Sequence, residues 1–207
     1  TIFTHRHPDH IGDLSRISEI YDAPIWASSI TLDSISHEGL SSIIEEGDSF
    51  ALRGASGMME WGVIETPGHC PGHICLVGDS GIVSGDNCVV VGTILVPSSE
   101  GNMNSYISGL ERILSLGPTM LFPGHGPACT NPPRILERYI KHRTARHDGV
   151  LNAVSSGLSS LEEITLHAYQ DSPDAHPILS RDQALSHLNS LVESNIVEVR
   201  AGHYFPA

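Results

Sequence analysis

The chain opens with four side chains of metal-ligand type in the run His5-Arg-His7-Pro8-Asp9-His10. His5 and His7 alternate as on an extended segment, so both side chains would point to one side. Pro8 ends that segment and turns the chain before Asp9 and His10. Imidazole nitrogens together with a carboxylate oxygen are a ligand mixture that zinc favours. The run therefore predicts one loop that offers two ligands to one metal ion and two to a second.

Three further ligand-type residues each follow a short apolar run that ends in glycine. They are His69 in Thr-Pro-Gly-His, Asp86 in Ser-Gly-Asp and His125 in Pro-Gly-His-Gly-Pro. Each pattern predicts a strand followed by a loop, because glycine allows a sharp turn and a close backbone approach. Any one of them could be an ordinary loop residue, and the opening cluster could be a chance product of 13 histidines. A two-metal site needs about three protein ligands per ion, so the whole set favours a dinuclear site.

In this order the motifs resemble those of the metallo-β-lactamase superfamily. The resemblance implies an α/β fold, the αβ/βα sandwich, with a dinuclear metal site at one edge. It also implies two sets of ligands and one bridge, namely His5, His7 and His69 for a first zinc ion, Asp9, His10 and His125 for a second, and Asp86 between them. Two Zn²⁺ are the expected cofactors, with Mn²⁺ or Fe²⁺ as alternatives.

The resemblance implies hydrolysis. Two zinc ions close together lower the pKa of a shared water from 15.7 toward about 7, and the resulting hydroxide attacks an acyl carbon or a phosphorus. Asp9 is expected to be the catalytic proton acceptor, because it is both a ligand and a neighbour of that hydroxide. His73, in Pro-Gly-His-Ile, is expected to lie behind the ligands or to be structural.

A narrower resemblance covers nearly the whole chain. The segments Asn102-Met-Asn-Ser-Tyr106, Pro-Gly-His-Gly-Pro and Tyr-Ile-Lys-His-Arg within residues 135–146 resemble the metallo-β-lactamase-like protein 2 group. That group implies a small winged-helix-like C-terminal domain and endonuclease action on single-stranded RNA, in mitochondria for its animal members. The family carries roughly half of its sandwich before the opening histidine motif. We therefore expect the N-terminal part of the sandwich to be missing from this sequence.

Two other functions stay open. The pattern Thr-Pro-Gly-His-x-x-Gly-His-Ile is shared in kind with thioesterases and acyl hydrolases of the glyoxalase II type, although the region after Asp86 lacks their glutathione-binding pattern. A metal-stabilised scaffold without catalysis is the third reading, and the complete ligand set argues against it. The expected partner is thus single-stranded RNA or a small acyl or thioester substrate.

Composition limits these functions further. With 207 residues, 40% of them hydrophobic, the chain can bury a core in one or two domains. No apolar run approaches the roughly 18 residues of a membrane span, so we expect no membrane contact. Together with the resemblance to a group whose animal members are mitochondrial, this leads us to expect an intracellular protein, cytoplasmic or mitochondrial. The net charge of −13 counts against tight nonspecific binding of nucleic acid. The four cysteines are expected to be reduced and buried.

The elements that must position the site follow from hydrophobic periodicity. The pattern predicts a catalytic domain over residues 1–130, built from helices at 11–21 and 103–116 and strands at 23–27, 58–65, 73–78, 81–84 and 120–122. This alternation is typical of a layered α/β sandwich.

Residues 131–207 are predicted to form the winged-helix-like domain. Its long helix spans 134–154 and carries a stripe of Ile135, Tyr139, His142 and Arg146. Ser159 with Glu162 predicts a capping box, Ser180 with Gln183 predicts a second one before a helix at 184–191, and a β-hairpin follows from 196. Arg181 is the only arginine or lysine on the expected recognition helix, so a structural or pocket-covering role is favoured over nucleic-acid binding.

Overall fold

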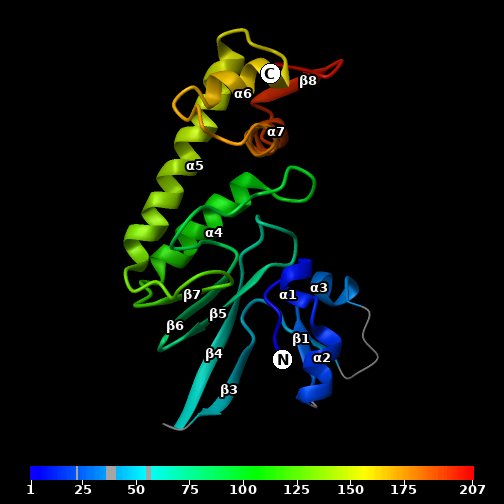
Figure 1. Ribbon diagram of the computed structural model, residues 1–207, viewed down its shortest axis with the longest axis vertical. Coiled ribbons are helices and arrows are strands. Elements are labelled where there is room, and N and C mark those ends of the chain that lie inside the picture. The colour runs from blue at the N-terminus through cyan, green and yellow to red at the C-terminus, as the bar shows by residue number, and fades with distance from the viewer. Residues whose placement is uncertain (22, 36–40, 55–56) are drawn as a thin grey trace.

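The computed structural model describes residues 1–21, 23–35, 41–54 and 57–207. A five-stranded sheet in the order β3-β4-β5-β6-β7 forms its centre (Figure 1). Its strands are β3 Ser49–Gly54, β4 Gly57–Glu65, β5 Ile74–Gly78, β6 Gly81–Gly85 and β7 Leu121–Pro123. Neighbours pair antiparallel except β6 and β7, which are parallel. The predicted strands of this region are confirmed, and each bound lies within one residue of its prediction.

Helix α4, Met103–Ser115, packs on one face of the sheet. Its residues Met103, Tyr106, Leu110 and Ile113 are fully buried, and their three- and four-residue spacing forms one apolar stripe. The side chain of Asn102 accepts a hydrogen bond from the backbone N–H of Ser105 and so caps the first turn. The helix predicted over 103–116 is therefore confirmed.

The opposite face of the sheet packs against the N-terminal segment. Successive strand residues face opposite sides, so Cys75 joins the cluster beneath α4 while Ile74 and Leu76 join a cluster with Trp26 and Phe50. The N-terminal elements are α1 Pro8–Ile11, α2 Leu14–Ile20, β1 Ile25–Ala27, α3 Ser29–Asp33 and β2 Ser41–Ile43. Strands β1 and β2 pair in parallel as a separate two-stranded sheet.

The single helix predicted over 11–21 is wrong. The chain forms α1 and α2, with Gly12 and Asp13 between them. Helix α1 begins at Pro8, because the fixed φ of proline suits the first helical position, and so Asp9 and His10 lie on a helix rather than on a loop. The apolar spacing continues across the break and could not reveal it.

The C-terminal elements are α5 Pro132–Ser155, α6 Leu161–Ala168, α7 Pro177–Glu193, β8 Val197–Arg200 and β9 His203–Pro206. They enclose their own apolar cluster, which includes Val150, Ile164 and Leu188. Helix α5 belongs to both cores, because Leu136 near its start packs in the cluster beneath α4. The winged-helix assignment and the boundary at residues 130 and 131 stay predictions.

Both predicted capping boxes need correction. The box at α6 is formed by Ser160 and Glu163, one residue later than predicted, because two overlapping Ser-x-x-Glu patterns occur there. Helix α7 begins at Pro177, so Ser180 lies inside it and donates its hydroxyl to the carbonyl of Pro177 at 3.1 Å.

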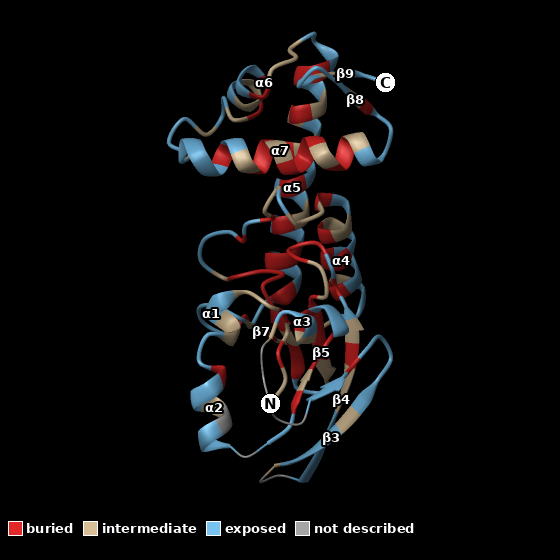
Figure 2. Ribbon diagram, turned by 90° about the vertical axis from the view of Figure 1, so that its right-hand side faces the viewer, coloured by how far each residue is buried: buried red, intermediate tan, exposed pale blue. Residues whose placement is uncertain are grey.

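The predicted stripe on α5 also needs correction at one position. Arg143 is buried there at 2% exposure, whereas His142 is exposed. Figure 2 shows the buried residues gathered around the sheet, α4, α5 and α7, while α2 and β3 are largely exposed. No helix in the described ranges is long and apolar enough to cross a membrane.

Candidate metal centre

The opening histidines lie on a segment held between two strands. The backbone N–H of Phe3 donates to the carbonyl of Trp26 at 2.9 Å, and the carbonyl of Thr4 accepts from the N–H of Ile74 at 2.9 Å. These hydrogen bonds fix the segment beside β1 and β5. His5 is consequently fully buried, and α1 starts from the same edge of the sheet.

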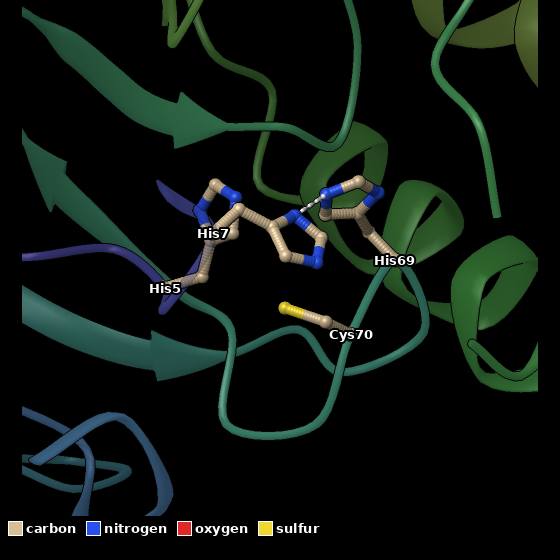
Figure 3. A group of neighbouring side chains, drawn as sticks. All are labelled: His5, His7, His69 and Cys70. Atoms are coloured by element: carbon tan, nitrogen blue, oxygen red, sulfur yellow. Dashed lines mark hydrogen bonds between the residues drawn. The ribbon is translucent and has the colours of Figure 1, made fainter. Parts of the chain in front are cut away.

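The first group of ligand-type side chains is His5, His7 and His69, with Cys70 beside them (Figure 3). The candidate ligand atoms of these four residues lie within 4.8 Å of one another. His69 Nε2 and His7 Nδ1 are 2.8 Å apart. His69 comes from the loop between β4 and β5, as its Pro-Gly pattern predicted.

The second group is Asp9, His10 and His125. His10 Nε2 and His125 Nε2 lie 3.2 Å apart, and His125 Nε2 lies 3.1 Å from Asp9 Oδ2. Asp9 and His10 sit on α1, and His125 follows β7, so two segments far apart in sequence meet at the sheet edge.

The Asp86 carboxylate lies between the two groups. Its Oδ2 is 3.7 Å from His69 Nε2 and 3.6 Å from His125 Nε2, and its Oδ1 is 3.5 Å from His10 Nε2. Asp86 follows β6 directly, where Gly85 adopts φ +48° and a Cβ atom would lie 2.6 Å from His73 Nε2. Glycine is thus required for the turn that aims Asp86 between the groups. The structure brings all seven predicted ligand residues together, and their role as ligands stays a prediction.

The unpaired atoms of the cluster fit metal ions. His5 Nε2 and Asp86 Oδ1 are buried and have no hydrogen-bond partner among the described residues. Buried polar atoms without partners are costly, and a bound cation would satisfy both. At Gly124 a Cβ would come within 2.5 Å of Asp86 Oδ1 and 2.6 Å of His10 Cε1. A side chain at position 124 would therefore clash with two of the candidate ligand residues.

The tautomers of two histidines support the same fit. His69 Nδ1–H donates to the carbonyl of Leu95 at 2.7 Å, and His7 Nε2–H donates to Glu100 Oε1 at 2.8 Å. In the neutral rings the unprotonated nitrogens therefore face each other, an arrangement that a shared cation stabilises. The His/Asp cluster is consistent with a dinuclear metal site.

The charge states of His5, His69 and Asp86 also suit metal ligation, which requires neutral imidazoles and an ionised carboxylate. Burial, with smaller effects from neighbouring imidazoles, holds the pKa of His5 far below its usual range, and burial lowers the pKa of His69. Burial alone would raise the pKa of Asp86, but the neighbouring imidazoles of His10, His69 and His125 together outweigh it and lower that pKa.

His73 supports Asp86 from behind. Its Nε2 accepts a hydrogen bond from the backbone N–H of Asp86 at 3.0 Å, so its Nδ1–H is left to donate to Thr66 Oγ1, also at 3.0 Å. Burial lowers the pKa of His73 to about 3, which keeps the ring neutral and able to accept. This position agrees with the expected place of His73 behind the ligands.

Glu100 and Leu95 were missed by sequence reasoning. Glu100 accepts from His7 and also from the Arg6 guanidinium at 2.6 Å. Neither residue stands in a motif, and both contact histidines that are distant in sequence. No local sequence pattern therefore indicated either contact. A further histidine, His187, is fully buried on α7 with its Nδ1 3.2 Å from His147 Nδ1, which is a structural position.

The prediction for the cysteines is confirmed. Cys70, Cys75, Cys88 and Cys129 are all free and buried. Burial raises the pKa of the Cys70 thiol to about 12, so the thiol beside the first group is protonated at neutral pH.

We expect the metal-depleted protein to lose stability on mild acidification. Burial lowers the pKa values of His5, His73 and His187 in the folded state, while the unfolded chain titrates near its usual value of about 6.5. Below that pH the unfolded state binds more protons. The free energy of unfolding should then fall by up to about 1.4 kcal/mol per pH unit for each histidine.

Urea unfolding of metal-depleted protein between about pH 7 and pH 5 measures this slope. The His187→Gln variant, remote from the cluster, should give a shallower slope. A free energy of unfolding that stays level over this range would contradict the expectation.

Comparison with known proteins adds family evidence to this geometry. Residues 1–125 match the family described as the metallo-beta-lactamase superfamily. The "Beta-lactamase-like protein 2 homolog" of Caenorhabditis elegans is 28% identical over 95% of this chain and 66% of its own length. The "Thioesterase pkgB" of Emericella nidulans is 29% identical over 70% of this chain and 39% of its own. The chain thus spans less than two thirds of each relative.

A solved structure shares the fold. The crystal structure of a beta-lactamase domain protein from Burkholderia ambifaria superimposes with a TM-score of 0.81 over 100% of this chain and 73% of that protein, at 21% sequence identity. The α/β metallo-beta-lactamase fold followed by a helical C-terminal region is therefore shown.

Proposed function

This chain belongs to the metallo-beta-lactamase superfamily, and we propose that it is a dinuclear metal-dependent hydrolase. One observation carries the proposal: the Asp86 carboxylate lies within 3.7 Å of imidazole nitrogens from both ligand-type groups. His5, His7 and His69 would hold one ion, and Asp9, His10 and His125 the other. Bound there, the pair of ions would lower the pKa of a water toward about 7 and polarise the substrate's oxygen.

The nitrogen and oxygen donors leave the identity of the ions open. Imidazole suits zinc, iron and other transition metals, and carboxylate oxygen suits harder ions such as Mn²⁺. The Cys70 thiol, the only sulfur in the first group among the described residues, is protonated. We therefore propose two Zn²⁺, with Mn²⁺ or Fe²⁺ as alternatives.

Asp9 is the proposed proton acceptor. Its side chain is 59% exposed, so it faces the side from which a substrate arrives, and its Oδ2 lies 3.1 Å from His125 Nε2. A carboxylate held at this mouth can take a proton from the attacking water and pass it to the leaving group. His73 holds the Asp86 backbone and takes no direct part.

We propose a phosphodiester of single-stranded RNA as the substrate. The resemblance of the chain to the metallo-β-lactamase-like protein 2 group supports this choice, and the similarity to the Caenorhabditis elegans "Beta-lactamase-like protein 2 homolog" over 95% of the chain supports that resemblance. The net charge of −13 and the pairing of Arg6 with Glu100 argue for weak binding of the RNA backbone. The protein would therefore recognise mainly the nucleotides next to the cleaved phosphodiester.

An acyl thioester is the second candidate. The similarity to the thioesterase of Emericella nidulans favours it, and attack on an acyl carbon needs the same residues as attack on phosphorus. Binding such a substrate would need few arginine or lysine side chains that are free of acidic partners.

A paired assay of the 207-residue chain distinguishes the two. With two equivalents of Zn²⁺, we expect cleavage of end-labelled single-stranded RNA, little cleavage of the matching duplex, and slow hydrolysis of an S-acyl thioester. An Asp9→Asn preparation, purified in parallel, controls for contaminating ribonuclease and should be at least about a hundredfold slower, as for loss of a general base. Efficient thioester hydrolysis with intact RNA would replace the first candidate by the second.

A further inference from the structure

The segment 93–101 between Asp86 and α4, here called the strap, contacts the first ligand group from outside. The Leu95 carbonyl accepts from His69 Nδ1–H at 2.7 Å, and Glu100 accepts from His7 Nε2–H at 2.8 Å. These are the nitrogens that face away from the shared metal position. The strap therefore sets the rotation of two of the three histidines in this group.

The strap is itself held by α7. The Gln183 side chain pairs with both backbone groups of Val96, accepting from its N–H at 3.2 Å and donating to its carbonyl at 2.9 Å. Asp182 accepts from the hydroxyl of Ser98 at 2.6 Å, and Asn189 donates to the carbonyl of Ser98 at 3.0 Å. Residues from about ninety positions further along the chain thus hold Val96 and Ser98.

Helix α5 also holds the strap, through Arg143. We call the contacts of Gln183 and Arg143 with residues 94 and 96 the clamp. The Arg143 guanidinium donates to Gln183 Oε1 at 2.9 Å and to the carbonyl of Ile94, and it lies 5.6 Å from the ring centre of Tyr106. Gln183 is 5% exposed and Val96 is fully buried. Because unpaired buried amides are costly, the clamp favours one arrangement of the strap.

The second ligand group is not connected in this way. Within the described parts of the chain, the side-chain polar contacts of Asp9, His10 and His125 run to one another and to Asp86. A change in α7 should therefore reach the first group and leave the second nearly unaffected.

We propose that α7 positions the first metal group through the strap, with Gln183 as the positioning residue for His69. The inference rests on the proposed metal function. Gln183 clamps Val96 on both backbone groups, Leu95 lies beside Val96, and the Leu95 carbonyl fixes the ring of His69. Outer partners of ligand histidines commonly alter metal affinity by about 10–100-fold. Gln183 acts on His69 only through Val96 and Leu95, so for its loss we expect metal affinity to fall by roughly threefold to tenfold.

The test is Gln183→Met, which keeps the side-chain length and removes every hydrogen bond of the amide. Zn²⁺ affinity is measured by competition with a chromophoric chelator on the full 207-residue chain. We expect the affinity for the ion of the first group to fall roughly threefold to tenfold and the affinity for the second ion to stay within about twofold. Asp182→Ala, which removes the contact with Ser98 from a less buried position, should show a smaller shift in the same direction and serves if Gln183→Met does not fold.

The matched control is Leu188→Ala on the same helix. Leu188 is fully buried in the C-terminal apolar cluster, so its loss lowers the melting temperature without touching the strap. Its Zn²⁺ affinities should equal those of the parent chain. The inference is overturned if Gln183→Met and Asp182→Ala keep parental affinities, if both ions weaken equally, or if Leu188→Ala weakens the first ion as much. A parent chain that binds fewer than two ions would instead overturn the proposed function.

Discussion

Replacing Asp86 by asparagine should abolish hydrolysis and release at least one of the two metal ions. The side chain is buried, 8% exposed, and its oxygens lie 3.5–3.7 Å from imidazole nitrogens of both groups. Asparagine has nearly the same shape, so the fold and the turn at Gly85 should persist. It lacks the negative charge, however, and its amide N–H₂ would donate to an unprotonated imidazole nitrogen and so occupy the lone pair that a metal ion would bind.

The expected loss exceeds the about 10–100-fold in affinity or activity that follows removal of an outer partner. Metal content after gel filtration and turnover of either candidate substrate measure it. Asp79→Asn, an exposed aspartate in the turn between β5 and β6, is the matched control and should keep both properties. Two bound ions and parental turnover in Asp86→Asn would contradict the dinuclear assignment.

Removal of the metal ions should lower the melting temperature by roughly 10 °C at neutral pH. Free His5 Nε2 and Asp86 Oδ1 are buried without partners among the described residues, and facing unprotonated nitrogens of His7 and His69 repel each other. A ligand present at a thousand times its dissociation constant stabilises the folded state by about 4 kcal/mol. For a chain of this size, each kcal/mol corresponds to about 2–4 °C.

Thermal melts with Zn²⁺, after chelation, and after Zn²⁺ is restored measure this difference. The Asp86→Asn variant should show a smaller gain on adding Zn²⁺, because it has lost a ligand shared by both ions. Equal melting temperatures with and without metal would show that the cluster is satisfied by its own hydrogen bonds. Restoration by Zn²⁺ excludes cysteine oxidation during chelation as the cause.

The ligand cluster was accessible from sequence because its signals are local. A short apolar run, a glycine and then His69, Asp86 or His125 report a strand end and a presenting loop within a few residues. Hydrophobic periodicity located α4 and the strands β4, β5 and β6 to within one residue for the same reason. Such patterns record what each segment does with its nearest neighbours.

Local patterns were insufficient where two readings fitted equally well. The apolar spacing from Ile11 onward runs across the break between α1 and α2, and two overlapping Ser-x-x-Glu patterns competed at α6. His142 and Arg143 are adjacent on α5, and only the position of the neighbouring elements decides which one is buried. Arginine is the unexpected choice, because charged side chains are rarely buried unless they find several partners.

By itself, the sequence determined which side chains form the cluster, which strand-end loops carry His69, Asp86 and His125, and what chemistry these residue types favour. Only the tertiary structure decided what orients them. Glu100 reaches His7 across 93 residues, and Gln183 reaches Val96 across 87. Such contacts leave no periodic trace, because each depends on how sheet and helices pack and not on neighbours in the chain. The geometry of the site therefore depends on the whole fold, whereas its ligand-type residues come from four short segments, residues 5–10 and the loops that carry His69, Asp86 and His125.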